Sequence, residues 1–347
     1  MPKRVFVGLS GGVDSSVTAA LLKEQGYEVT GVYMKNWSQD LPGFPCPWKE
    51  DFQDAKRVAV QLGIDFKMYD FETDYRHKVV DYMTREYQAG RTPNPDIMCN
   101  QEVKFKLFLE TCLEDGADLI ATGHYARVKD GKLYKAKDDN KDQTYFLYRV
   151  TEDALQKTLF PLGEYTKPEV RELAKKFGLV TASKKESMGI CFVGKVGIKD
   201  FLLHELGPQK LGDIVNQLGK IIGRHDGAIF YTIGQRHGLD VGGGLPYYVT
   251  GKDMKQNIVY VTTDLNDQNL WSKEIRLTDI YWINEAPKSE AQLQVRTRHR
   301  APLINCVFHH KNNVRYLTLT DEIRAVTPGQ SAVLYDGELV VGGGIVL

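Results

Sequence analysis

The run Ser10–Ser16 (Ser-Gly-Gly-Val-Asp-Ser-Ser) has the residue types of a phosphate-binding turn. It follows the apolar run Val5–Leu9, which predicts a buried strand, and precedes apolar residues spaced for one face of a helix. Glycines let successive backbone N–H groups point into one concavity, and a helix N-terminus adds partial positive charge. The run therefore predicts a pyrophosphate site, with Asp14 suited to hold Mg2+. The alternative is an ordinary tight turn.

Two common phosphate loops do not fit this run. It lacks the Gly-Lys-Ser/Thr ending of a Walker A loop and the three glycines of the dinucleotide fingerprint. The pattern S-G-G-x-D-S instead resembles the PP-loop of ATP pyrophosphatases. Those enzymes cleave ATP between the α and β phosphates and activate an oxygen by adenylation.

Two cysteines stand in segments suited to thiol chemistry. Cys99 lies in a proline-bracketed loop ahead of a helix predicted at Lys104–Leu113, and a thiol near a helix start has a lowered pKa. Asp96, three residues earlier, could act as acid or base. Cys191 has basic and glycine neighbours, which favours an exposed thiol. A buried structural thiol remains the alternative for both, and it is the favoured interpretation of Cys46, Cys112 and Cys306.

A basic region without acidic residues extends from Ala291 to Thr320. Strand alternation would place Arg296, Arg298 and Arg300 on one face. That face would bind phosphates, or it would be a solvated edge strand that uses charge to avoid aggregation. The pattern alone leaves both interpretations open.

The first part of the chain alternates strands with helices. Strands are predicted at Val5–Leu9, Glu28–Met34, Phe66–Tyr69 and Asp118–Thr122, which indicates a doubly wound parallel sheet with helices on both faces. Ligands bind beyond the carboxyl ends of such strands. After about Gly207 the elements become short β-runs, and from Ile275 onward the sequence alternates like a small antiparallel barrel.

The predicted architecture is therefore multidomain, α/β followed by β. We expect an N-terminal doubly wound domain over 1–205, a small central mixed or β domain over 206–270, and a C-terminal antiparallel β-barrel over 271–347. The 347 residues are enough for several cores.

Composition narrows the class further. Lys+Arg and Asp+Glu are equal at 45 each, so net charge does not decide for or against a nucleic-acid partner. No apolar stretch would span a bilayer, and Met1–Arg4 leads straight into the first strand, so we expect a cytoplasmic protein without a membrane role. The five cysteines include no C-x-x-C pair, so we expect neither a disulfide framework nor a tightly bound metal cluster.

Taken in order, these motifs resemble the tRNA-specific 2-thiouridylase family, whose N-terminal domain is adenine nucleotide α-hydrolase-like and carries a PP-loop. The resemblance runs from about Lys3 to Ile345. The motifs that carry it are Gly8–Ser15, Met34–Trp37, Gly90–Asn100, Ala121–Tyr125, Lys141–Gln143 with Tyr145–Leu147, Gly189–Phe192 and Thr327–Val333.

The resemblance implies ATP-dependent 2-thiolation of the wobble uridine in tRNA anticodons. In the family, the cysteine matching Cys191 accepts sulfur as a persulfide, and the one matching Cys99 is the nucleophile that releases it, leaving a disulfide between the two. The aspartate matching Asp96 is the acid–base residue. ATP and Mg2+ are the implied cofactors. The implied partners are tRNA of the Lys, Glu and Gln acceptors and a persulfide-carrying donor protein.

The resemblance also implies binding residues. The target base faces Asn94, Pro95 and Asp96, and His299 replaces a tyrosine expected beside the arginine, which weakens a stacking role there. The implied ATP contacts are Gly8, Leu9, Ser10, Gly11, Gly12, Val13, Asp14, Ser15, Met34 and Gly123. The implied tRNA contacts are His124, Lys141, Asp142, Gln143, Arg298, His299 and Gln330.

Two other functions keep part of this pattern. An amide-forming ATP pyrophosphatase would use the same loop but would not need Cys99 or Cys191. A nucleotide-binding RNA adaptor would keep the loop and the basic region without turnover. The products formed from tRNA, ATP and a persulfide donor separate all three.

Overall fold

The computed structural model describes residues 2–41, 43, 45–185, 197–239, 241–242, 244–312 and 314–347. The N-terminal sheet has the strand order β3-β2-β1-β4-β7, and each neighbouring pair is parallel. This confirms the predicted doubly wound sheet. Its strands are β1 (Arg4–Gly8), β2 (Glu28–Lys35), β3 (Asp65–Asp70), β4 (Leu119–Ala121) and β7 (Thr158–Leu159).

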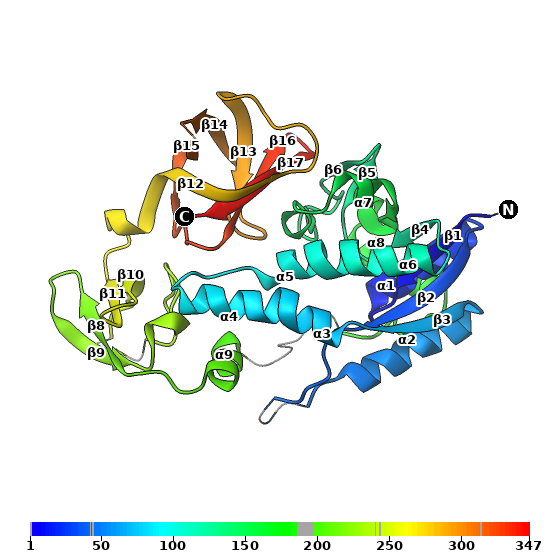
Figure 1. Cartoon of the computed structure of the whole chain (residues 1–347), viewed down its shortest axis with the longest axis horizontal. Helices are drawn as coiled ribbons and strands as arrows, with labels where there is room; N and C mark the ends of the chain where they lie inside the picture. The colour runs from blue at the N-terminus through cyan, green and yellow to red at the C-terminus, as the bar shows by residue number, and fades with distance from the viewer. Residues whose placement is uncertain are drawn as a thin grey trace.

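Helices cover this sheet and extend beyond it. Two long helical runs lie side by side in Figure 1 and lead from the sheet toward the central strands. One consists of α3 (Glu72–Tyr75), the π-helical η1 (Arg76–Val80) and α4 (Asp81–Gln88); the other of α5 (Pro95–Met98), the π-helical η2 (Cys99–Leu107) and α6 (Phe108–Glu114). The remaining helices of this part are α1 (Val13–Glu24), α2 (Trp48–Leu62), α7 (Glu152–Gln156) and α8 (Lys167–Lys176), with short turns η3 (Thr144–Phe146) and η4 (Pro161–Glu164).

The central part contains a four-stranded mixed sheet of order β10-β11-β8-β9. Its β11 and β8 are parallel, and the other neighbours are antiparallel. Helix α9 (Ile198–Leu206), which packs against α4, was not predicted from the sequence. The other elements here are β8 (Gly212–Asn216), β9 (Ile221–His225), β10 (Tyr248–Asp253), β11 (Ile258–Thr262), η5 (Ala228–Phe230) and η6 (Gln268–Leu270).

The C-terminal part is a closed antiparallel barrel, as the alternation predicted. Strand β12 pairs with both β15 and β17, which closes the order β12-β15-β14-β13-β16-β17. The hairpin β5 (Arg127–Lys129) and β6 (Lys132–Tyr134) joins this sheet through β17, so the N-terminal part contributes strands to it (Figure 1). The barrel strands are β12 (Trp271–Trp282), β13 (Ala291–Arg296), β14 (Ile304–Lys311), β15 (Val314–Arg324), β16 (Ser331–Asp336) and β17 (Leu339–Val346).

One expectation about the barrel is wrong. Strand β13 ends at Arg296, so Arg296, Arg298 and Arg300 do not share a strand face. Arg296 is buried, whereas Arg298 and Arg300 lie exposed in the turn that follows. The buried carboxylate of Asp142 explains the difference, because it draws the Arg296 guanidinium inward at 2.9 Å. Within the described ranges, no helix is long and apolar enough to cross a membrane.

Candidate active site

The glycine turn after β1 is built as a phosphate cradle. Gly11 has φ 75°, and a Cβ there would collide with the carbonyl oxygen of Asp51 in α2, so only glycine fits. Gly12 is the N-cap of α1. The hydroxyl of Ser15 accepts a hydrogen bond from the Ser10 backbone N–H at 3.2 Å, which closes the turn. The turn therefore presents backbone donors at the positive end of a helix.

The other predicted nucleotide residues lie around this turn. A Cβ added to Gly123 would lie 2.8 Å from the Ser15 backbone nitrogen, so the loop after β4 packs directly against the start of α1. A Cβ on Gly8 would lie 3.0 Å from the methyl carbon of Met34 at the end of β2. The carboxyl ends of β1, β2 and β4 thus bring Gly8, Met34 and Gly123 to one edge of the sheet.

The carboxylate of Asp14 is engaged by two residues, Lys167 and Tyr125, to which the sequence assigned no role of their own. The Lys167 ammonium, from the first turn of α8, lies 2.7 and 2.8 Å from its two oxygens. The Tyr125 hydroxyl donates to Oδ1 at 2.9 Å. Lys167 is 9% and Tyr125 2% exposed, whereas the Asp14 side chain is 32% exposed. The Asp14–Lys167 ion pair therefore lies at the glycine turn, and its carboxylate is partly open to solvent.

The segment before Cys99 is helical, not a loop as predicted. The helix begins at Pro95, because Asn94 caps it by accepting from the Asp96 N–H at 3.2 Å and proline is favoured in the first turn. Cys99 therefore lies inside a continuous helical run, and it is 2% exposed. Burial raises the pKa of the Asp96 carboxyl, and the nearby Lys104 opposes that rise.

His124 joins the loop after β4 to the helix that carries Cys99. Its Nδ1 lies 2.8 Å from the Thr122 hydroxyl and its Nε2 lies 3.5 Å from the Lys104 ammonium, while its ring contacts Phe105. Burial, with the charge of Lys104, holds the pKa of His124 well below its usual value. His124 therefore stays neutral at pH 7 and is only 9% exposed.

Cys191 lies outside the described residues, but the chain segment that ends at Lys185 is anchored to α2 and α8. The Lys184 ammonium pairs with Asp51 at 2.8 Å and Asp54 at 2.6 Å, both in α2. Arg171 of α8 donates to the carbonyl oxygens of Ala182 and Lys184. Because the carbonyl of Asp51 abuts Gly11, the chain is anchored beside the glycine turn shortly before Cys191.

The predicted tRNA residues of the Lys141–Gln143 segment face in two directions. The Asp142 side chain is fully buried; it pairs with Arg296 at 2.9 Å and accepts from the Thr144 hydroxyl. The side-chain amide oxygen Oε1 of Gln143 accepts from the Tyr125 N–H at 2.9 Å, so Gln143 positions the residue that binds Asp14. Lys141 is partly exposed.

The predicted tRNA residues of the barrel contact three different parts of the chain. The Gln330 amide donates to the carbonyl oxygens of Thr92 at 2.8 Å and Pro93 at 3.4 Å. Arg298 is exposed while its Nη2 donates to the Ala325 carbonyl at 3.0 Å. His299 packs on Phe146 with ring centroids 4.6 Å apart. Gln330 thereby ties the barrel to the segment that leads into the helix of Cys99.

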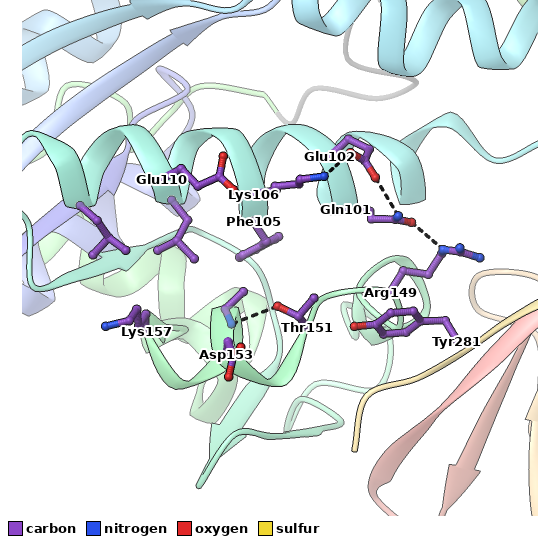
Figure 2. A pocket seen from close by; sticks show the side chains of 13 residues that line it. Gln101, Glu102, Phe105, Lys106, Glu110, Arg149, Thr151, Asp153, Lys157 and Tyr281 are labelled. Carbon is purple, nitrogen blue, oxygen red and sulfur yellow. Dashed lines mark hydrogen bonds and ion pairs between the residues drawn. The ribbon is translucent and has the colours of Figure 1, made fainter. Parts of the chain in front are cut away.

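A cavity of about 400 Å3 is lined by the helical run that carries Cys99 and by residues 149–157, and its lining includes no residue of the glycine turn. Figure 2 shows Gln101 and Arg149 bridging its mouth, with Arg149 beside the Tyr281 ring. The Arg149 Nε donates to Gln101 at 2.5 Å and its Nη1 pairs with Asp279 of β12 at 3.0 Å. Arg149, another residue that sequence analysis missed, therefore ties the Cys99 helix to the barrel.

Comparison with known proteins gives the family. Residues 3–195 match the model of a tRNA methyl transferase HUP domain, 199–263 a tRNA methyl transferase PRC-barrel domain, and 272–346 an aminomethyltransferase beta-barrel domain. A tRNA-specific 2-thiouridylase MnmA from Bacillus thuringiensis (strain Al Hakam) is 48% identical over 98% of this chain and 93% of its own length. One from Listeria monocytogenes serotype 4a (strain HCC23) is 47% identical over 99% and 94%.

Among solved structures, a 4-thiouridine synthetase–RNA complex with bound ATP is 19% identical, with a TM-score of 0.38 over 53% of this chain and 43% of that chain. That similarity is too weak to bear on this site. The curated relatives match almost from end to end at nearly half identity, and the residues matched by the family models contain every motif described above. The chain belongs to the tRNA-specific 2-thiouridylase family.

Proposed function

We propose that this protein is an ATP-dependent tRNA-uridine 2-sulfurtransferase that acts on the wobble uridine. The observation that supports this function best is a glycine turn without a lysine of its own, packed against the loop whose His124 meets the helix that carries Cys99. The near full-length similarity to tRNA-specific 2-thiouridylases supports the same substrate. Such a protein would work in the cytoplasm, where mature tRNA is found.

ATP would bind with its phosphates on the Ser10–Ser15 turn and with Met34 and Gly123 beside the nucleoside. The uridine O2 would form a bond to the α phosphorus, and the bond from that phosphorus to pyrophosphate would break with its electron pair. Asp14 is the residue that would hold Mg2+, one carboxylate being enough where phosphates supply further ligands. When bound, the ion would neutralise part of the phosphate charge.

Asp96 would exchange the proton of uridine N3. Adenylation of O2 makes N3–H acidic, and a carboxyl whose pKa is raised by burial is suited both to take a proton and to return it. Asn94 and Pro95, beside it, would face the base. The uridine must leave the anticodon stack to reach them.

Sulfur would arrive as a persulfide on Cys191 and attack C2. The C2–O2 bond would break and AMP would leave with O2 and the electron pair. The Cys99 thiolate would then attack the sulfur of Cys191, which leaves the transferred sulfur on C2 and forms a Cys99–Cys191 disulfide. If Cys99 attacks first, hydrosulfide is released and attacks C2 instead. A dithiol reductant would restore both thiols by supplying two electrons.

The partners follow from these steps. A persulfide-carrying protein would load Cys191, and the ion pair of Lys184 with Asp51, whose carbonyl lies against the glycine turn, supports a role for this segment near the nucleotide. The tRNA, of the Lys, Glu or Gln type, would lie along Lys141, Arg298 and His299. For Asp142 and Gln330 we propose a supporting role, because their side chains already bond within the protein. We also keep 1–205, 206–270 and 271–347 as the proposed domains.

Methyl transfer, which the description of the matched family model mentions, fits less well. It needs neither an ATP-cleaving turn nor a cysteine pair. An amide-forming ATP pyrophosphatase would use the turn but leave Cys99 without a task. Both alternatives therefore leave a motif of this chain unexplained.

Product analysis tests the proposal. Incubated with wobble-uridine tRNA, ATP, Mg2+ and a persulfide donor, the protein should form 2-thiouridine together with equal amounts of AMP and pyrophosphate. Mass spectrometry of the digested tRNA and chromatography of the nucleotides measure both products. Release of ADP and phosphate, or an unmodified tRNA, would refute it.

A further inference from the structure

The glycine turn has no lysine, but the fold places one beside it. Lys167, 153 residues after Asp14, lies in the first turn of α8, and α8 packs against α1. Its ammonium spans both oxygens of Asp14 at 2.7 and 2.8 Å. The Lys167 side chain is 11% exposed and the Asp14 side chain 32%, so the pair lies at the boundary between protein and solvent.

Neighbouring contacts fix Asp14 and Lys167 beside the glycine turn that is expected to bind phosphates. Asp14 and Ser15 belong to the first turn of α1, where backbone donors point at the expected phosphates. The Lys167 backbone is fixed, because its N–H donates to Asp138 at 2.9 Å, and the Glu169 carboxylate accepts from the Thr166 N–H at 2.6 Å. Tyr125, in the loop after β4, donates a hydrogen bond from its hydroxyl to Asp14. An ammonium so placed has a compact charge with several rotatable donors.

We propose that Lys167 is a pyrophosphate-binding residue of the adenylation site. This inference rests on the proposed function and goes beyond it. When ATP binds, the ammonium exchanges one carboxylate oxygen of Asp14 for an oxygen of the β or γ phosphate. As uridine O2 bonds to the α phosphorus, the electron pair of the broken bond moves onto pyrophosphate, and the ammonium stabilises that charge. Lys167 thus does the work of the lysine that a Walker A loop carries within itself.

Binding of inorganic pyrophosphate, measured by titration calorimetry on the full chain, tests the proposal. Lys167→Met should weaken pyrophosphate binding at least about tenfold, as expected for loss of a hydrogen bond from a charged group. AMP, which lacks the β and γ phosphates, should bind as before. Lys175→Met is the control, since Lys175 lies on the same helix, is 66% exposed and pairs with the exposed Glu172. Unchanged pyrophosphate affinity in Lys167→Met would overturn the proposal.

A second comparison keeps the test decisive if Lys167→Met fails to fold. Asp14→Asn and the double variant Asp14→Asn/Lys167→Met both lack the carboxylate, so neither leaves it buried without its partner. The double variant should bind pyrophosphate at least about tenfold more weakly than Asp14→Asn. Equal affinities would overturn the proposal. The assay needs neither tRNA nor sulfur, so its failure differs from a failure of thiolation.

Discussion

Two ion pairs join distant segments of this chain, and they differ in what surrounds them. Lys167 reaches Asp14 across 153 residues, and Arg296 reaches Asp142 across 154. The Asp142–Arg296 pair is sealed, with side chains 0% and 8% exposed. Asp142 also accepts from the Ala136 N–H and the Thr144 hydroxyl. Its oxygens have all the partners they need.

The Asp14–Lys167 pair lies at the edge of the glycine turn and is less enclosed. A lysine also forms point-charge contacts that a phosphate oxygen can replace, whereas a guanidinium fits a carboxylate through its fixed fork. The comparison teaches that two ion pairs of similar charge and similar sequence separation can have different roles. Enclosure makes one pair structural, and access to an anion makes the other functional.

The largest effect is expected from opening the sealed pair. Asp142→Ala leaves the Arg296 guanidinium buried without its counter-charge, which should lower the free energy of unfolding by about 3–5 kcal/mol. Urea denaturation measures this loss. Asp139→Ala is the matched control, since Asp139 is exposed and its loss should change little. A stable Asp142→Ala that fails to bind tRNA would show instead that Asp142 contacts RNA directly.

Removing Lys167 should cost less stability. Because the Asp14 carboxylate keeps access to water and its bond from Tyr125, Lys167→Met should lower the free energy of unfolding by about 1–3 kcal/mol. The same urea series compares the two variants. A loss as large as that of Asp142→Ala would mean that both pairs are structural, and the contrast between them would disappear.

His124 is a third buried titratable group, and unlike the two ion pairs it is kept neutral. Its folded pKa is lowered, so the unfolded chain binds the proton more readily below the ordinary value of 6.5. Stability from this site is therefore present above that value and is lost as pH falls below it toward the folded pKa. The urea midpoint should drop between pH 7 and pH 5, and His124→Phe should drop less. An identical drop in both proteins would assign the acid sensitivity to other groups.

The smallest effect concerns an exposed cation. Arg298→Ala should weaken tRNA binding and reduce the slope of log affinity against log salt by about one, as for loss of one phosphate contact, with ATP binding unchanged. Filter binding at several salt concentrations measures the slope. Arg276→Ala, an exposed arginine of the same barrel, is the control. Equal slopes in the two variants would favour a merely solvated side chain at Arg298.

Periodicity and turn residues predicted much of the fold. Strands β1, β2 and β3 and the barrel alternation follow from local patterns, and Gly11 and Gly12 mark the phosphate turn. The sequence predicts that the helix near Cys99 begins at Lys104, because Pro93 and Pro95 indicate a loop, but it begins at Pro95. Asn94-Pro95 is also a helix-start signal. The end of β13 could not be predicted, because a distant carboxylate draws Arg296 inward.

The site could be predicted only in part for the same reason. Residues within the turn are neighbours in sequence, whereas Lys167 and Tyr125 reach it through tertiary contacts across long separations. Arg149 likewise meets the helix of Cys99 only through the fold. One signal was available for Lys167. A phosphate turn without its own lysine leaves room for a cation from elsewhere in the chain.

Sulfur transfer by Cys191 and Cys99 is the central claim, and a labelled-sulfur experiment tests it most directly. Wild-type protein and single serine variants receive radiolabelled persulfide from a donor protein, and bound label is measured before and after tRNA and ATP are added. Cys191→Ser should take up no label, whereas Cys99→Ser should carry label that a reductant removes yet deliver none to tRNA. Full thiolation of tRNA by Cys191→Ser would contradict the account.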